Sequence, residues 1–182
     1  APQQSGKTTV SDGIEIFKNL SLKSKNFFMK NQILYELEIP FKNQSKSKLK
    51  DKTDRPWYIE GQGTYDCKIN FSKNLVFLKQ KRYAVQSTRL SDNLSFCNHL
   101  QIILDRDPQV ISIKTENGES FPKEIIEDVK KVTKDATIEI DWKDNDFMMI
   151  DNKRFMHGRT AINEGEKREI INVQTLKSNL SY

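Results

Sequence analysis

The residues best suited to chemistry lie near the end of the sequence, between Ile140 and Val173. A histidine stands there before a glycine and an arginine, as His157-Gly158-Arg159, and a basic pair, Lys167-Arg168, follows it. A neutral imidazole can bind a divalent transition metal. A guanidinium can hold a carboxylate through two parallel hydrogen bonds, and it keeps its charge when half-buried. A lone histidine on an apolar strand is, however, usually a core residue, so this histidine alone does not establish a metal site.

A second chemical pattern occupies the first eight residues, APQQSGKT, which fit the spacing of a phosphate-binding loop. Such a loop works only when it leaves a buried strand and leads into a helix whose N-terminal amides hold phosphate. No strand is visible before this stretch, and the residues after Thr8 read as a short extended piece and a turn. We therefore expect another role for Gly6-Lys7-Thr8.

The composition sets the broad class of protein. A chain of 182 residues with 36% hydrophobic residues is long enough for one domain with a core, and we expect a single domain over 1–182. The sequence contains neither a membrane-spanning run nor a signal peptide, so we expect a cytoplasmic protein. Cys67 and Cys97 are too few for a disulfide framework, and buried thiols are expected.

The net charge of +5 permits binding to nucleic acid, but most basic residues are balanced by acidic ones along the chain. The clearest basic cluster, Lys42 to Lys52, is low in complexity, and we interpret 42–56 as a flexible basic loop. A nucleic-acid-binding domain that acts through this cluster is an alternative, though a less favoured one.

Short β-prone runs separated by turn residues dominate the sequence from Trp57 onward, and a few helical patterns interrupt them. Helices are predicted at Gly13 to Leu20, with Asp12 as N-cap, at Ser24 to about Tyr35, and after Pro122. Later strands are predicted at 137–142, 146–150, 155–162 and 168–173, with a turn at Asp144-Asn145-Asp146. This arrangement favours a mainly β fold, an antiparallel sandwich or jelly roll with helical insertions.

The segment from Ile140 to Val173 resembles the C-terminal signature of a known family, the iron(II)- and 2-oxoglutarate-dependent oxygenases of the taurine dioxygenase-like (TauD/TfdA, clavaminate synthase-like) family. The resemblance rests on Trp142, the acidic turn, the apolar run 147–150, Asp151-Asn152, the His-Gly-Arg triplet and the basic pair. It implies a double-stranded β-helix, incomplete in this chain, and a dioxygenase that uses Fe(II), 2-oxoglutarate and O2.

The same resemblance assigns roles to single residues. His157 is similar to the distal iron ligand, and Arg168 to the anchor of the far carboxylate of 2-oxoglutarate. Ser5-Gly6-Lys7-Thr8 resembles a Gly-Gly-Asp/Glu-Thr piece, which implies that Thr8 donates its hydroxyl to the 2-oxoglutarate carboxylate. Ser5 and Lys7 both depart from that pattern.

Residues around substrate are assigned on similar grounds. Phe96-Cys97-Asn98-His99 is similar to a stretch of the syringomycin-type hydroxylase branch, which implies a small substrate such as an amino acid or its derivative. We expect Asn98, Arg159 and Asn152 to contact substrate or to support the site. Arg159 could equally form a salt bridge with Asp151. His99 is expected to be structural or to line the substrate pocket.

The family's first metal motif, His-x-Asp/Glu, is missing from the sequence. We therefore expect this chain to be the C-terminal portion of a longer oxygenase, whose N-terminal portion brings the first two ligands. A degenerate relative that has lost its metal and serves as a jelly-roll binding module is the alternative. No membrane partner is expected.

Overall fold

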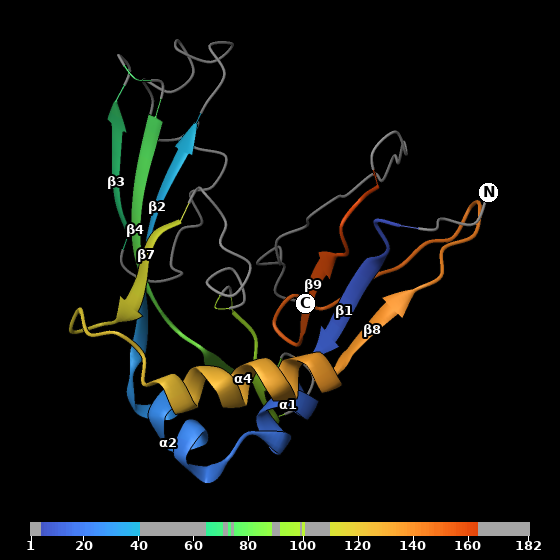
Figure 1. Cartoon of the computed structure of the whole chain (residues 1–182), viewed down its shortest axis with the longest axis horizontal. Helices are drawn as coiled ribbons and strands as arrows, with labels where there is room; N and C mark the ends of the chain where they lie inside the picture. Colours follow the sequence, from blue (N-terminus) through green and yellow to red (C-terminus); the bar gives the residue numbers. More distant parts are fainter. Residues whose placement is uncertain are drawn as a thin grey trace, which may run out of the picture.

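The computed structural model describes residues 5–40, 65–70, 73, 75–88, 92–98, 100 and 110–163. Two antiparallel sheets stand side by side, and the helices gather at one end of both, as Figure 1 shows. Strands outweigh helices, so the expected mainly β fold with helical insertions is confirmed. The sheets formed by these residues do not close into a barrel.

The smaller of the two sheets carries the candidate site. The order of strands in this sheet is β8 (Thr137–Ile140), β1 (Thr8–Asp12) and β9 (Phe155–Arg159). The central strand, β1, is antiparallel to both of its neighbours. The central position of β1 brings residues near the two ends of the sequence side by side.

The larger sheet has the order β3 (Tyr65–Asn70), β4 (Leu75–Tyr83), β2 (Gln32–Pro40) and β7 (Val110–Thr115). A short hairpin of β5 (Val85–Ser87) and β6 (Leu94–Phe96) follows β4. Ile33 and Tyr35 of β2 point to the same face and are buried there, which fixes the register of the sheet against the core.

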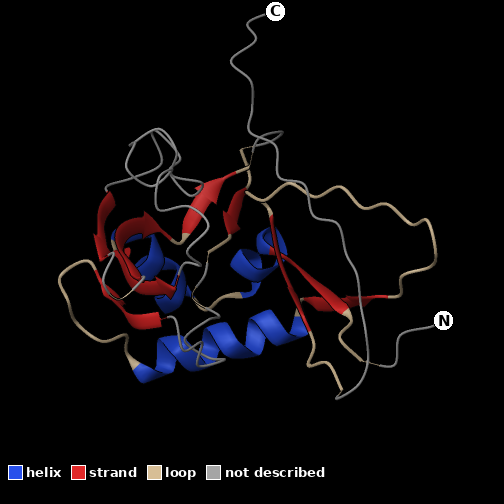
Figure 2. Ribbon diagram, turned by 90° about the horizontal axis from the view of Figure 1, so that it is seen from above, coloured by secondary structure: helices blue, strands red, loops and turns tan. Residues whose placement is uncertain are grey.

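Among the described residues, three helices form the layer at the base of the sheets: α1 (Gly13–Asn19), α2 (Leu22–Lys30) and α4 (Lys123–Asp135). Seen from above in Figure 2, α4 runs as one long rod from the larger sheet toward the smaller one. Its buried stripe of Ile125, Val129 and Val132 packs on a core that also holds buried side chains of α1, α2, β2 and β6. Within this core the rings of Phe28 and Phe96 meet edge to face, with centroids 5.0 Å apart.

The predicted helices at 13–20 and after Pro122 are confirmed, and Asp12 is the N-cap of α1. The predicted helix from Ser24 to Tyr35 is wrong in its second half, because α2 ends at Lys30 and β2 begins at Gln32. The apolar run at 33–35 is compatible with either a helix or a strand. It forms a strand because it pairs with β4 on one side and with β7 on the other.

The predicted strand at 146–150 is also wrong, since these residues form neither a strand nor a helix. Phe147 and Met149 are 86% and 85% exposed, so the side chains of these two residues do not contribute to the core. The turn before this segment is confirmed: Asn145 has a φ of 71°, and the Asp146 amide donates to the Lys143 carbonyl. The strand predicted at 155–162 ends at Arg159.

Two expectations lie outside the described residues: the basic loop at 42–56 and the strand at 168–173. In the part of the chain that the structure describes, no helix has the length and apolar character needed to cross a bilayer.

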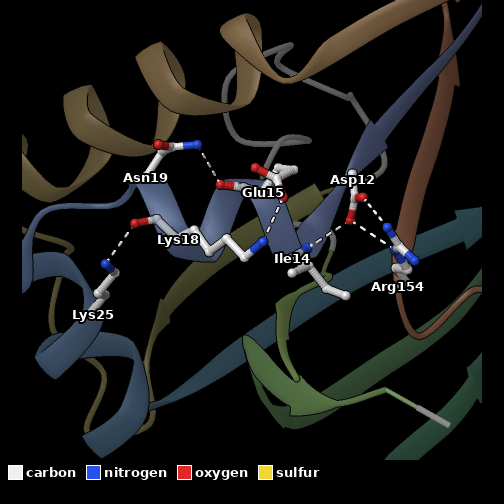
Figure 3. A network of polar contacts seen from close by, with 7 residues as sticks. All are labelled: Asp12, Ile14, Glu15, Lys18, Asn19, Lys25 and Arg154. Atoms are coloured by element: carbon white, nitrogen blue, oxygen red, sulfur yellow. Dashed lines mark hydrogen bonds and ion pairs between the residues drawn. The ribbon is translucent and has the colours of Figure 1, made fainter. Parts of the chain in front are cut away.

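The junction between β1 and α1 joins three separate parts of the chain. The Asp12 carboxylate accepts a hydrogen bond from the Ile14 amide at 2.9 Å, which caps α1. The same carboxylate accepts two hydrogen bonds from Arg154, from Nη2 at 2.5 Å and from Nε at 3.1 Å, as Figure 3 shows. Arg154 lies immediately before β9, so one side chain fixes the helix start and the entry to the strand that carries His157.

Gly13 makes this junction possible because three segments come too close for any side chain. Its amide donates to the Arg154 carbonyl at 2.8 Å. A Cβ atom here would lie 2.2 Å from Ser95 Oγ, 2.6 Å from the Arg154 carbonyl oxygen and 2.7 Å from the Phe96 carbonyl oxygen. Two of these neighbours are backbone atoms, which cannot move without disturbing β6 or the approach to β9.

We expect Gly13→Ala to destabilise the protein by about 1–3 kcal/mol or more, the range found for overpacked cores. Urea unfolding followed by circular dichroism measures the change. Gly158→Ala is a matched control, because a Cβ atom there meets only the Thr9 hydroxyl, at 3.2 Å. Equal losses in the two variants would contradict this account of Gly13.

Asp12 should also make the free energy of unfolding depend on pH in the acidic range. Partial burial raises the pKa of Asp12, but the hydrogen bonds from Arg154 and the Ile14 amide and the guanidinium charge lower it, and the net pKa lies below its ordinary value. A lowered folded-state pKa means that the stabilisation is present above the unfolded pKa, about 4, and is lost as pH falls through the folded pKa.

Asp12→Asn keeps a good N-cap and removes only the charge. We therefore expect the variant to lose on the order of 1 kcal/mol near neutral pH, because Arg154 is 42% exposed and solvent weakens the pair. The difference from the parent protein should shrink as the pH falls below about 4 and vanish once the pH lies below the lowered folded-state pKa of Asp12. Glu15→Gln, on the exposed side of α1, is the control, and a gap that persists in acid would count against the ion pair.

Candidate functional site

Thr8 and His157 lie on the same face of neighbouring strands. Thr8 pairs with Arg159 across the β1–β9 ladder, and Val10 pairs with His157. Directly opposed residues of an antiparallel pair share a face, and so do alternate residues along one strand. The hydroxyl, the imidazole and the Arg159 guanidinium therefore project from one face of the smaller sheet.

The Trp142 indole holds the Thr8 hydroxyl from a third segment. Its Nε1–H donates to Thr8 Oγ1 at 2.7 Å, and both residues are half-buried. Trp142 follows β8, whose Ile140 lies opposite Thr8 on the other side of β1. A hydroxyl oxygen that accepts a hydrogen bond still carries its own O–H, so the indole fixes where that oxygen sits without using its proton.

The stretch before β1 continues the pairing with the chain after β9. The Gly6 amide donates to the Ala161 carbonyl at 2.8 Å, and the Lys7 amide donates to Thr160 Oγ1 at 2.9 Å. Gly6 has a φ of 64°, in the left-handed region that favours glycine. Gly6-Lys7-Thr8 thus leads into a strand and not into a helix, which is incompatible with a phosphate-binding loop.

Asp12 is the carboxylate on the same strand face as Thr8, but it is fully engaged by Arg154 and by the start of α1. The described residues contain no group of three or more His, Cys, Asp and Glu side chains that could hold a metal ion. An iron site of the facial-triad type needs two histidines and a carboxylate. The described residues therefore offer one suitable ligand, His157, which is exposed, and do not complete such a site.

Arg159 is exposed at the end of β9, and the described residues include no ion pair between it and Asp151. Asp151 instead forms the turn before β9: its side chain accepts from the Lys153 amide at 2.9 Å. Asn152 is exposed in the same turn, and its carbonyl accepts a hydrogen bond from the Cys97 thiol at 3.0 Å. These contacts give the turn a role in directing β9 toward β1.

Asn98 lies beyond β6, and its side chain serves the local backbone. Its Nδ2 donates to the Ala84 carbonyl at 3.3 Å, and its Oδ1 accepts from the Leu100 amide at 2.7 Å. Neighbouring Cys97 is a partly buried free thiol. Burial, together with the Asp151 charge, raises the pKa of Cys97 to about 11, so the thiol stays protonated at neutral pH.

His99 and Arg168 lie outside the described residues, as does the side chain of Cys67. Sequence reasoning gave no role to Trp142 or Arg154, although both fall in the segment that carried the resemblance. The signal for Trp142 was its position at the end of the alternating strand predicted at 137–142, which in the structure ends at Ile140. Nothing local marked Arg154 as the partner of Asp12, because the two are 142 positions apart.

Comparison with known proteins adds the family. No curated protein matches the chain. A family model described as "Taurine catabolism dioxygenase TauD, TfdA family" matches residues 1–174. The match covers both the Thr8 segment and the His157 segment, which the structure brings together on one sheet. The chain belongs to the TauD/TfdA family of dioxygenases, whose members adopt a jelly-roll fold and typically depend on Fe(II) and 2-oxoglutarate.

Proposed function

We propose that this chain carries part of the active site of an Fe(II)- and 2-oxoglutarate-dependent oxygenase that hydroxylates or otherwise oxidises a small substrate. The observation that supports this most is the shared sheet face of Thr8 and His157. Family membership supports the reaction class, in which O2 oxidises the substrate while 2-oxoglutarate becomes succinate and CO2.

His157 is proposed as one iron ligand. A neutral imidazole suits Fe(II), and this one projects from a strand held in place by pairing along all of β9. The remaining ligands, a histidine and a carboxylate in a His-x-Asp/Glu motif, would come from polypeptide outside the described residues, because the described ones do not supply them.

Thr8 and Arg168 are proposed to hold a carboxylate of 2-oxoglutarate. A hydroxyl can donate one hydrogen bond to a carboxylate, and the Trp142 indole keeps the Thr8 oxygen at a fixed place on the sheet. Arg168 would add a bidentate, charge-assisted contact. For the substrate itself we propose an amino acid or a derivative of one.

Loss of a residue that only supports a metal ligand typically weakens metal binding by about 10- to 100-fold. Replacement of His157 by alanine should weaken Fe(II) binding by more than this, because it removes a ligand itself. Equilibrium dialysis of the intact protein with Fe(II) under argon measures the affinity. Succinate release in the presence of 2-oxoglutarate should fall in parallel.

His99→Ala is the control for metal binding, because the sequence contains only these two histidines. It should leave the Fe(II) affinity near that of the parent protein. If the intact protein takes up no Fe(II) at all, the oxygenase proposal fails and a metal-free binding module of the same fold becomes the better interpretation.

Trp142→Phe keeps an aromatic ring and removes only the donor to Thr8. We expect it to raise the KM for 2-oxoglutarate by about 3- to 10-fold with little change in kcat, as loss of one hydrogen bond of about 1 kcal/mol predicts. Thr8→Val should raise the KM further, and the double variant should be no worse than Thr8→Val alone. Additive effects would show that the indole does not act through Thr8.

A further inference from the structure

We propose that Arg159 forms the positive half of a carboxylate-binding subsite beside His157. This inference rests on the proposed function, because it concerns a ligand that lies against the same sheet face. It names a chemical class for that ligand: a small carboxylic acid with an apolar carbon segment.

The strand register places Arg159 in two short rows of side chains. One row crosses the sheet as Arg159, Thr8 and Ile140, and the next row crosses it as His157, Val10 and Ile138. Opposed residues in such rows have Cβ atoms about 4.5–5.5 Å apart. The side chains of Arg159 and Thr8 therefore leave the sheet next to each other.

Arg159 differs from the other cations around this sheet. Lys7 projects from the opposite face, where it pairs with Glu139 at 3.1 Å, and Arg154 is held by Asp12. Arg159 is exposed, and its side chain makes no hydrogen bond or ion pair with any residue that the structure describes. A structural role of the kind that Arg154 performs is thus not visible for Arg159.

The charges on the strands leave this arginine unbalanced. Among the residues of β1, β8 and β9, the acidic side chains are Asp12 and Glu139. Arg154 neutralises the first and Lys7 neutralises the second. The face that holds His157 consequently carries one guanidinium charge that these strands do not compensate, and it attracts an anion.

The neighbouring side chains specify what kind of anion fits. A planar guanidinium binds a carboxylate through two hydrogen bonds, and Thr8 lies directly beside it. The next row lies about 7 Å along the strands, two residues away. That row contains the exposed His157, the buried Val10 in the middle, and Ile138, which is 61% exposed. A carboxylate at Arg159 would thus place a few carbon atoms over an apolar surface and lead them toward His157.

Binding of radiolabelled succinate to the metal-free, full-length chain tests the subsite directly. Equilibrium dialysis at constant ionic strength would compare the parent protein with Arg159→Gln, Arg159→Lys and Lys7→Gln. We expect Arg159→Gln to weaken succinate binding about 10-fold or more, as loss of a charged hydrogen-bond partner predicts. Arg159→Lys should weaken it less, because the charge remains without the planar fork.

Lys7→Gln is the matched control, since it removes one cation from the opposite face of the same sheet. It should bind succinate like the parent protein. Equal uptake by the parent protein and Arg159→Gln would overturn the proposal, and so would an equal loss in Lys7→Gln, which would indicate diffuse attraction. Unfolding midpoints of all the variants verify that each protein is folded.

This test separates the subsite from the proposed oxygenase function. Succinate binding needs no metal, so His157→Ala should retain it even though that variant loses Fe(II). In the metal-loaded protein, a raised KM of Arg159→Gln for 2-oxoglutarate would identify the carboxylate as that of 2-oxoglutarate. An unchanged KM, together with lost succinate binding, would identify it as a carboxylate of the substrate.

Discussion

The junction at Asp12-Gly13 is the constraint on which the arrangement of this protein depends. The Asp12 carboxylate caps α1 and binds Arg154, which precedes β9. Gly13 beside it has no side chain, so the backbone at Arg154 and at Phe96 of β6 can approach it closely. Without this close approach β9 would lack a fixed starting point next to β1. The shared face of Thr8 and His157 is thus a consequence of packing at the opposite end of the same two strands.

Local sequence patterns correctly predicted the helices that have a clear helical spacing of apolar residues or a clear capping residue. The helix α4 carries apolar residues at helical spacing, and α1 begins at an acidic cap, so both could be identified without tertiary information. The run at 33–35 could not be assigned in this way, because pairing with β4 and β7 decides its conformation. The apolar run at 147–150 was wrongly predicted as a strand. Among the described residues it pairs with no other strand, and Phe147 and Met149 are exposed.

The candidate site shows a similar division. His157 and Thr8 could be proposed from sequence because they lie in motifs that resemble a family, and the register then puts them on one face. The contact between Trp142 and Thr8 spans 134 positions, and only the pairing of β8 with β1 brings the two together. Nor could the sequence predict that the Arg159 side chain lacks an acidic partner among the described residues. This depends on Lys7 pairing with Glu139 and on Arg154 pairing with Asp12.

The helix α4, which connects the larger sheet to the smaller one at their base, limits how this chain can change in length. The helix has thirteen residues, so it is about 20 Å long, and it leads directly into β8. One residue added inside it would rotate everything beyond by about 100° and turn its apolar stripe away from Phe28 and Phe96. Insertions and deletions should therefore accumulate in the turns at 116–118 and 143–146, whereas α4 keeps a constant number of residues.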